Sequence, residues 1–102
     1  MIPPALATGR LTLVTDAMAR EILVGQDGKA YAVSFVHKPT RQERQVRARA
    51  FVVAASACES ARLLLNSRSS LFPDGVANSS GVVGRYLMDS VGSDGAGHFP
   101  QL

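Results

Sequence analysis

Apolar and polar residues alternate through the first half of the chain in the manner of half-buried β-strands. The alternation runs through "LTLVT" (residues 11–15), "AMAREILVG" and "AYAVSFVH", and it returns in "RQVRARA" after the polar turn "KPTRQE". Between the second and third stretches, "QDGK" contains Asp27 and Gly28, a pair that accepts the positive φ angles of a tight hairpin turn. The pattern therefore predicts a three-stranded antiparallel meander within residues 11–49.

The pattern becomes continuously apolar in "AFVVAA" and then takes a helical period in "SACESARLLLNS". The apolar run over residues 51–55 predicts a strand buried on both faces, because a strand with one wet face would alternate. Ser56 precedes Glu59 by three residues, which predicts a capping box and a helix that begins near Ala57. One face of that helix carries the apolar residues Ala57, Ala61, Leu64 and Leu65. Residues 50–67 are thus expected to form a strand–turn–helix unit.

Four small residues, 54–57, separate the apolar run from the helix. Small side chains allow a ligand to approach the backbone closely, and the adjacent helix N-terminus favours an anion. Close packing of the helix on a sheet requires small residues as well. The pattern leaves both explanations open.

Residues 68–102 are predicted to be mostly loop. "GVVGRYLMD" (residues 81–89) predicts one or two helical turns, and "NSS" at Asn78 matches a glycosylation acceptor. Both ends, "MIPPALATGR" and "GSDGAGHFPQL", are rich in Gly or Pro and are expected to be loops. The predicted fold class is α/β for the whole domain, and α+β for this chain taken alone.

Composition indicates one small globular unit. The chain has 102 residues, of which 46% are hydrophobic and 19% charged, so it can form a modest core. A net charge of +3 is too weak to indicate nucleic-acid binding. Four arginines crowd into "RQERQVRAR", which favours a solvated hairpin over an anion-binding face: Arg41, Arg44, Arg47 and Arg49.

Candidate catalytic chemistry is sparse. The single cysteine, Cys58, excludes an internal disulfide and is expected to be an inert core thiol. His37 and His98 lack ligands at metal-site spacing, and Ser56 lacks the flanking glycines of a hydrolase nucleophile elbow. No apolar run approaches the roughly 20 residues that span a bilayer, and no signal peptide is recognisable. Localisation, cytoplasmic or periplasmic, stays open.

Three blocks of sequence resemble the glucose–methanol–choline (GMC) flavoprotein oxidoreductases. "FVVAASACESARLLLNS" is similar to their "VVLAAGAIESPRLLLNS"-type stretch, and "NSSGVVGRYLMDS" to their "NSSGLVGRNLMDH"-type stretch. Upstream, "LTLVTDAMAREILVGQDGKAYAVSFV" is similar to their "tgarVtrIlvdggrAtGVey"-type segment. The blocks occur in the family's order and together are more specific than any one of them.

The resemblance implies an FAD-binding domain of the glutathione-reductase type. In this family a main-chain amide and carbonyl of the strand that corresponds to "AMA" recognise the adenine, the small turn lies beside the FAD, and the "LMD" segment lies near the flavin. Residue by residue, the implied cofactor-binding positions are Met18, Ala19, Ala55, Ser56, Ala57, Asp89 and Ser90. Ser56 replaces the usual glycine, and Ser90 replaces a frequent histidine.

The resemblance also implies what the chain is expected to lack. The family's glycine-rich pyrophosphate loop and its catalytic histidine have no counterparts here, so residues 1–102 are expected to be a partial FAD-binding domain, inactive alone and without a catalytic residue. The parent is expected to oxidise the CH–OH group of a small-molecule alcohol or sugar by hydride transfer to FAD. Two alternatives remain at this point: a piece of another FAD or NAD flavoprotein, and a non-enzymatic β-meander module that binds a partner through its arginine hairpin.

Overall fold

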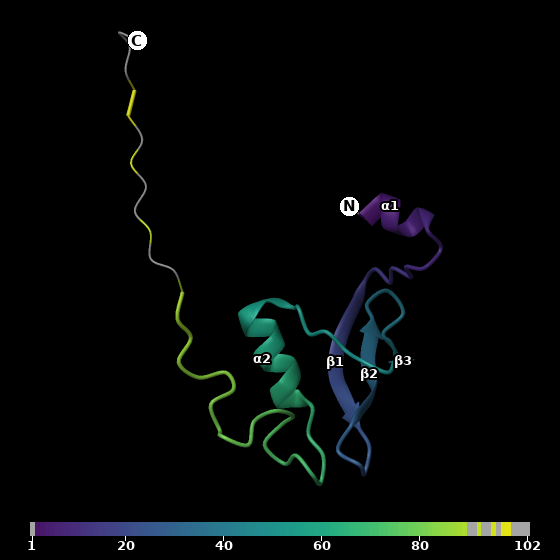
Figure 1. Ribbon diagram of the computed structural model, residues 1–102, viewed down its shortest axis with the longest axis vertical. Coiled ribbons are helices and arrows are strands. Elements are labelled where there is room, and N and C mark those ends of the chain that lie inside the picture. Colours follow the sequence, from purple (N-terminus) through teal and green to yellow (C-terminus); the bar gives the residue numbers. More distant parts are fainter. Residues whose placement is uncertain (1, 90–91, 93–94, 96, 99–102) are drawn as a thin grey trace.

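Three strands form one antiparallel sheet, and the longer of two helices packs beside it (Figure 1). The computed structural model describes residues 2–89, 92, 95 and 97–98. The elements in chain order are α1 (Ile2–Ala7), β1 (Ala17–Val24), β2 (Ala30–His37), β3 (Gln42–Arg47) and α2 (Ser56–Asn66). The combination of a meander and a helix confirms the predicted fold class.

The meander has the predicted order, with β2 between β1 and β3. The turn from β1 to β2 closes with a hydrogen bond of 2.9 Å from the Gly25 amide to the Lys29 carbonyl. Gly28 takes a φ of 75° in this turn, a conformation that glycine adopts without steric cost. The predicted hairpin at Asp27 and Gly28 is therefore confirmed.

The first strand begins later than the sequence pattern predicts. Residues 11–15 form no strand, and the pairing of β1 with β2 starts at Ala17, opposite His37. Asp16 adopts a φ of 51°, which turns the chain away from the sheet directly before β1. The prediction of a strand at "LTLVT" is wrong. Alternating polarity suits a strand in a sheet, but no described strand pairs with these residues.

The predicted buried strand over residues 51–55 is also wrong. This segment is irregular and largely exposed, and 92% of the surface of Val52 is accessible to solvent. A strand buried on both faces needs neighbouring strands for its hydrogen bonds and helices for its faces. Among the described residues no strand pairs with this segment, so the segment does not become a strand of the sheet.

Helix α2 begins at Ser56, within one residue of the prediction, but without the predicted capping box. Ser56 is the first helical residue rather than the cap, and its φ of 72° lies in the left-handed region. Its side chain makes no capping hydrogen bond; instead, the amide of Ala55 donates to the hydroxyl of Ser60 at 3.2 Å. Glu59 pairs with Arg62 rather than with the backbone of Ser56.

The N-terminal segment is not wholly a loop. Residues 2–7 form the short helix α1, whose second and third residues are Pro3 and Pro4. Proline is compatible with a first helical turn because its missing N–H has no intrahelical acceptor there. The helix buries none of its residues, so it adds nothing to the core.

Residues 81–89 form turns instead of the predicted helical turns. Gly81 and Gly84 have φ values of 69° and 76°, which interrupt a right-handed helix at two points. One turn, which contains Gly84, closes by a hydrogen bond of 3.1 Å from the Arg85 amide to the Val82 carbonyl. The two glycines that bracket the segment therefore break the helix.

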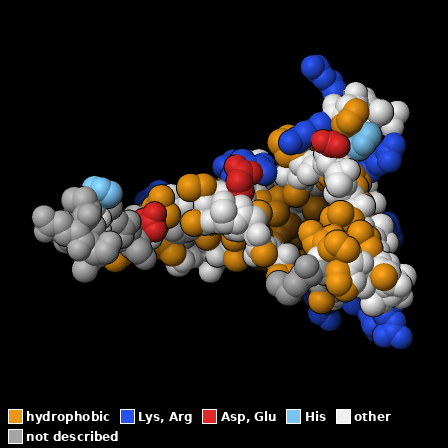
Figure 2. All heavy atoms as spheres, turned by 90° about the horizontal axis from the view of Figure 1, so that it is seen from above, with side chains coloured by type: hydrophobic (Ala, Val, Ile, Leu, Met, Phe, Trp, Pro, Cys, Tyr) orange, Lys and Arg blue, Asp and Glu red, His pale blue; other side chains and the backbone are white. Residues whose placement is uncertain are grey.

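The core of the described part is small. Its buried apolar residues are Ile22, Ala32 and Leu63, one each from β1, β2 and α2, and the buried polar residues are Ser34 and Ser67. Many large apolar side chains are exposed instead, and Figure 2 shows them over much of one face. Such extensive exposed apolar surface indicates contact with further protein.

Candidate functional site

The candidate site lies along the edge of β1 that faces away from β2. The carbonyl of Ala19 accepts a hydrogen bond of 2.9 Å from Nη2 of Arg62, on α2. Three residues further along the strand, the amide of Ile22 donates to Oγ of Ser67 at 2.7 Å. Both groups therefore point outward, away from β2. The pairing register shifts between Ala19 and Glu21, a β-bulge that places both groups on this edge.

Arg62 is held from two directions. Its Nε donates to Oε2 of Glu59 at 2.8 Å, while Nη2 reaches Ala19, and 34% of its side-chain surface is accessible. The planar guanidinium can make both contacts at once because its donors diverge in a fixed geometry. The residue thus ties the first turns of α2 to the strand position of Ala19.

Ser67 is the second link between α2 and β1. Its hydroxyl accepts from Ile22 and donates to the carbonyl of Leu63 at 2.6 Å, and the residue is buried. The carbonyl of Ser67 also accepts from the amide of Val76 at 3.1 Å, so the following loop is anchored here. One short side chain therefore joins the helix end, the sheet edge and the loop.

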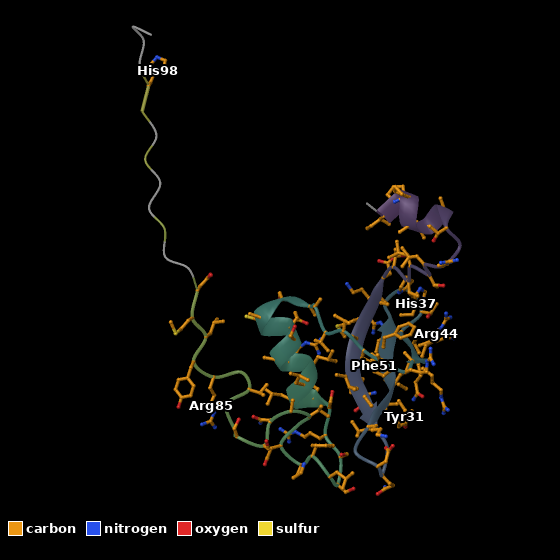
Figure 3. All side chains as sticks on the ribbon, in the orientation of Figure 1. Tyr31, His37, Arg44, Phe51, Arg85 and His98 are labelled. Atoms are coloured by element: carbon orange, nitrogen blue, oxygen red, sulfur yellow. The ribbon has the colours of Figure 1, made fainter. Side chains whose placement is uncertain are left out.

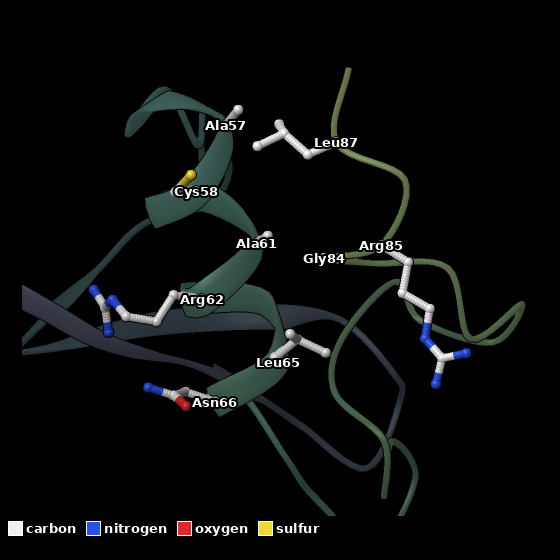
Figure 4. Close-up of a pocket in the computed structure, with 9 residues that line it drawn as sticks. All are labelled: Ala57, Cys58, Ala61, Arg62, Leu65, Asn66, Gly84, Arg85 and Leu87. Carbon is white, nitrogen blue, oxygen red and sulfur yellow. The ribbon is translucent and has the colours of Figure 1, made fainter. Parts of the chain in front are cut away.

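The small turn lies at the other end of α2. Ala55, Ser56 and Ala57 are exposed, and no described sheet strand covers them. Ala57 lines a cavity of about 470 Å³ between α2 and the segment that contains Leu87, together with Ala61 and Leu65 (Figure 4). The predicted apolar helix face thus borders this cavity in part. In the described part of the chain no strand packs on these residues, and both explanations of their small size, ligand approach and close packing, stay predictions.

The segment that borders this cavity comes very close to the helix at one point. A Cβ atom added at Gly84 would lie 3.1 Å from Cδ1 of Leu65 and 3.9 Å from Cβ of Ala61. A side chain at Gly84 would therefore require a small shift of Leu65, and the φ of 76° at this position also favours glycine. Residues 84–87 thus run along α2, with Gly84 beside Leu65 and Ala61 and Leu87 near Ala57 (Figure 4).

The remaining predicted positions lie at the margins of this arrangement. Met18 is 47% exposed and precedes Ala19 in β1. Asp89 is exposed at the end of the continuously described chain, and Ser90 lies outside the described residues. The structure thus links Ala19 to the small turn through α2, and it leaves the roles of all these positions as predictions.

A polar cluster on the sheet is separate from this edge. Oε1 of Glu43 accepts from the hydroxyl of buried Ser34, and Oε2 from Nη1 of Arg20, both at 2.5 Å. The hydrogen bond from Ser34, followed by the charge of Arg20, holds the pKa of Glu43 below its ordinary value. This cluster connects all three strands and has the character of a structural link.

The arginine hairpin is exposed along β3, as predicted (Figure 3). The guanidinium of Arg47 lies 5.6 Å from the ring centroid of Tyr31 on the neighbouring strand, and Arg44 donates to Gln42. These contacts are local. They fit a solvated face held by its own neighbours.

Three further predictions concern reactive or modifiable groups. Cys58 is exposed on α2, so the expectation of a core thiol is wrong: the cysteine lies on a turn of the helix that the sheet does not cover. Nδ2 of Asn78 donates to the carbonyl of Asp74 at 2.9 Å, which gives this side chain a structural role in its turn. Within the described ranges, no three His, Cys, Asp or Glu side chains cluster as metal ligands would, and no helix is long and apolar enough to cross a membrane.

Comparison with models of known protein families shows to which family the chain belongs. The family model of the GMC oxidoreductases matches residues 1–91. The chain belongs to the GMC oxidoreductase family. This finding confirms the resemblance to the GMC family.

Curated members of the GMC family match over most of the chain. The 6'''-hydroxyparomomycin C oxidase of Streptomyces lividus is 41% identical over 84% of this chain and 16% of its own length. The 2-methyl-1,2-propanediol dehydrogenase of Mycolicibacterium austroafricanum is 38% identical over 87% of this chain and 16% of its own. The fructose dehydrogenase large subunit of Gluconobacter japonicus is 35% identical over 78% and 14%. The chain therefore spans about a sixth of the length of these relatives.

Sequence reasoning about this GMC chain missed two side chains, Arg62 and Ser67, that close the edge of β1. Both lie in the quoted block "ESARLLLNS", where the helical period gives neither of them a partner. Their hydrogen bonds run to residues 43 and 45 positions away in the sequence. A local pattern carries no signal for partners at that separation.

Proposed function

We propose that this chain is a section of the FAD-binding domain of a GMC flavoprotein that oxidises the CH–OH group of a small-molecule alcohol or sugar. The family match over residues 1–91 carries the proposal. The names of the relatives support its substrate class, since they include an oxidase, a diol dehydrogenase and a fructose dehydrogenase. The proposed activity is that of the whole protein. This chain is a minor part of it, because it matches 16% of the length of a curated relative.

The main chain of Ala19 fits the adenine end of FAD. The Watson–Crick edge of adenine presents an amine donor and a ring-nitrogen acceptor. The Ala19 carbonyl is directed away from β2, and a strand residue turns its N–H and C=O to the same side. A main-chain acceptor and donor on the outer edge of a strand form the complementary pair. One lone pair of the carbonyl is used by Arg62, and the second remains for the amine.

The small turn fits a cofactor for a different reason. Ala55, Ser56 and Ala57 are exposed and present no long side chain, so a bulky planar group could approach their backbone. FAD would supply the redox chemistry by accepting a hydride from the substrate carbon. The residues of this chain would bind and orient the cofactor, and none of them is proposed to transfer a proton.

The proposal is tested by two substitutions of Ala19 in the intact protein that contains this chain. Ala19→Val keeps the main-chain donor and acceptor, so FAD should bind with nearly unchanged affinity. Ala19→Pro removes the N–H and disturbs the strand, so FAD affinity should fall by about tenfold or more. Affinity is measured by fluorescence titration of the flavin-free protein.

Two controls accompany this test. The 102-residue chain alone, mixed with FAD and passed through gel filtration, should emerge without flavin, since the family's pyrophosphate loop has no counterpart in it. The wild-type intact protein should retain FAD and oxidise a polyol or sugar. An intact protein that binds no flavin contradicts the proposed function; equal FAD affinity of the Val and Pro variants contradicts the role of Ala19.

A further inference from the structure

We infer that Arg62 is a positioning residue for the adenine end of the cofactor, an inference that rests on the proposed function. Its side chain is the described group that bonds the Ala19 carbonyl from outside the sheet, at 2.9 Å. The same residue belongs to the helix whose first residues form the small turn. Arg62 therefore joins the two parts of the chain that are proposed to contact FAD.

The geometry of this link makes it stiff. Nε of Arg62 is fixed by Glu59 at 2.8 Å, one turn earlier on α2, while Nη2 reaches across to β1. A guanidinium donates along fixed directions, so holding Nε also fixes the direction of Nη2. The result is a defined separation between the carbonyl of Ala19 and the start of α2.

The contact also sets the direction of the acceptor itself. Ala19 lies beside the irregularity between Ala19 and Glu21, where the ladder with β2 is locally interrupted. A carbonyl at a bulge is less constrained by its sheet neighbours than one in a regular ladder. A charged donor from α2 supplies the missing constraint and occupies one lone pair. The second lone pair is then presented in one direction.

Ser67, the other link between α2 and β1, does not substitute for Arg62. It bonds the amide of Ile22, three residues along β1, and lies at the C-terminal end of the helix. Loss of Arg62 would leave α2 attached to β1 through Ser67 and would remove the one of these two attachments that lies nearer the small turn. The expected consequence is a local change at the cofactor edge in a protein that stays folded.

The experiment uses the intact protein that contains this chain, with three variants. Arg62→Gln removes the charge and cannot span both partners, so the dissociation constant for FAD should rise by about 10- to 100-fold. Arg62→Lys keeps the charge but lacks the diverging donors of the guanidinium, so the dissociation constant for FAD should rise by a smaller factor. Arg68→Gln is the matched control: it makes the same chemical change near the end of α2, where Nε donates only to the Leu65 carbonyl at 3.3 Å, and it should leave the constant unchanged.

A purely structural role is separated from positioning by a second ligand. FMN lacks the adenosine part, so its weaker dissociation constant should be the same in wild type and in both Arg62 variants. Unfolding of the flavin-free proteins is monitored in parallel. Equal losses of FAD and FMN binding, or unchanged FAD binding in Arg62→Gln, would overturn the inference. A wild-type protein that binds no flavin would instead overturn the proposed function.

Discussion

Replacement of Ser67 by alanine should leave the amide of Ile22, on the outer edge of β1, without a hydrogen-bond acceptor. The Ser67 hydroxyl accepts from the Ile22 amide at 2.7 Å and donates to the Leu63 carbonyl at 2.6 Å. After the substitution Leu63 keeps a donor, since the Ser67 amide also bonds its carbonyl at 3.1 Å. The Ile22 amide keeps none. A single buried donor therefore loses its acceptor.

The magnitude follows from the burial of this pair. Ile22 is 7% exposed and Ser67 is 1% exposed, so water cannot replace the hydroxyl without local opening. An unsatisfied buried donor costs about 1–3 kcal/mol. That range corresponds to about 5- to 150-fold faster hydrogen exchange at Ile22, if exchange follows the opening equilibrium.

The assay is amide hydrogen exchange followed by NMR on wild type and Ser67→Ala. The Gly25 amide serves as the internal reference, because its bond to the Lys29 carbonyl lies in the hairpin turn and should not change. Ser60→Ala is the matched variant: its hydroxyl accepts from the exposed Ala55 amide, so Ile22 should keep its protection. An unchanged exchange rate at Ile22 in folded Ser67→Ala would refute the assignment of this hydroxyl as the acceptor.

Two further predictions concern strain and charge. Ser56→Gly should stabilise the chain by about 1 kcal/mol in denaturant unfolding, because a φ of 72° is strained for serine and open to glycine; a loss of stability would contradict this. The lowered pKa of Glu43 implies stability that is present at neutral pH and lost as pH falls below the ordinary range of a glutamate, through the folded-state pKa. Glu43→Gln should therefore reduce the acid dependence of unfolding, whereas Glu21→Gln, outside the cluster, should retain it.

The meander could be predicted because its determinants are local. Alternation in two strands and the pair Asp27 and Gly28 in the turn specify a hairpin without reference to distant residues. The start of α2 was predicted for a similar reason, although the capping argument was wrong. Ser56 entered the helix at positive φ, and its hydroxyl did not take the role that its sequence spacing suggested.

The failures share a different cause. Two patterns failed as predictions: the apolar run at residues 51–55 and the alternation at residues 11–15. Each is typical of a strand inside a sheet, and such a strand requires neighbouring strands. In the described part of the chain neither segment has one. A hydrophobic pattern therefore records the surroundings for which a segment is suited, and the backbone adopts the strand only where those surroundings are present.

The same distinction explains why the candidate site was only half predicted. Met18 and Ala19 came from the resemblance, but the groups that hold Ala19 in place came from the structure. Arg62 and Ser67 close the edge of β1 from one helix, one bonding a carbonyl and the other an amide. Main-chain recognition depends on where a backbone group points, and the side chain at that position does not determine the direction. The residues that fix it lie elsewhere in the sequence, so a search for binding residues by position alone finds Ala19 and omits the arginine that we infer positions it.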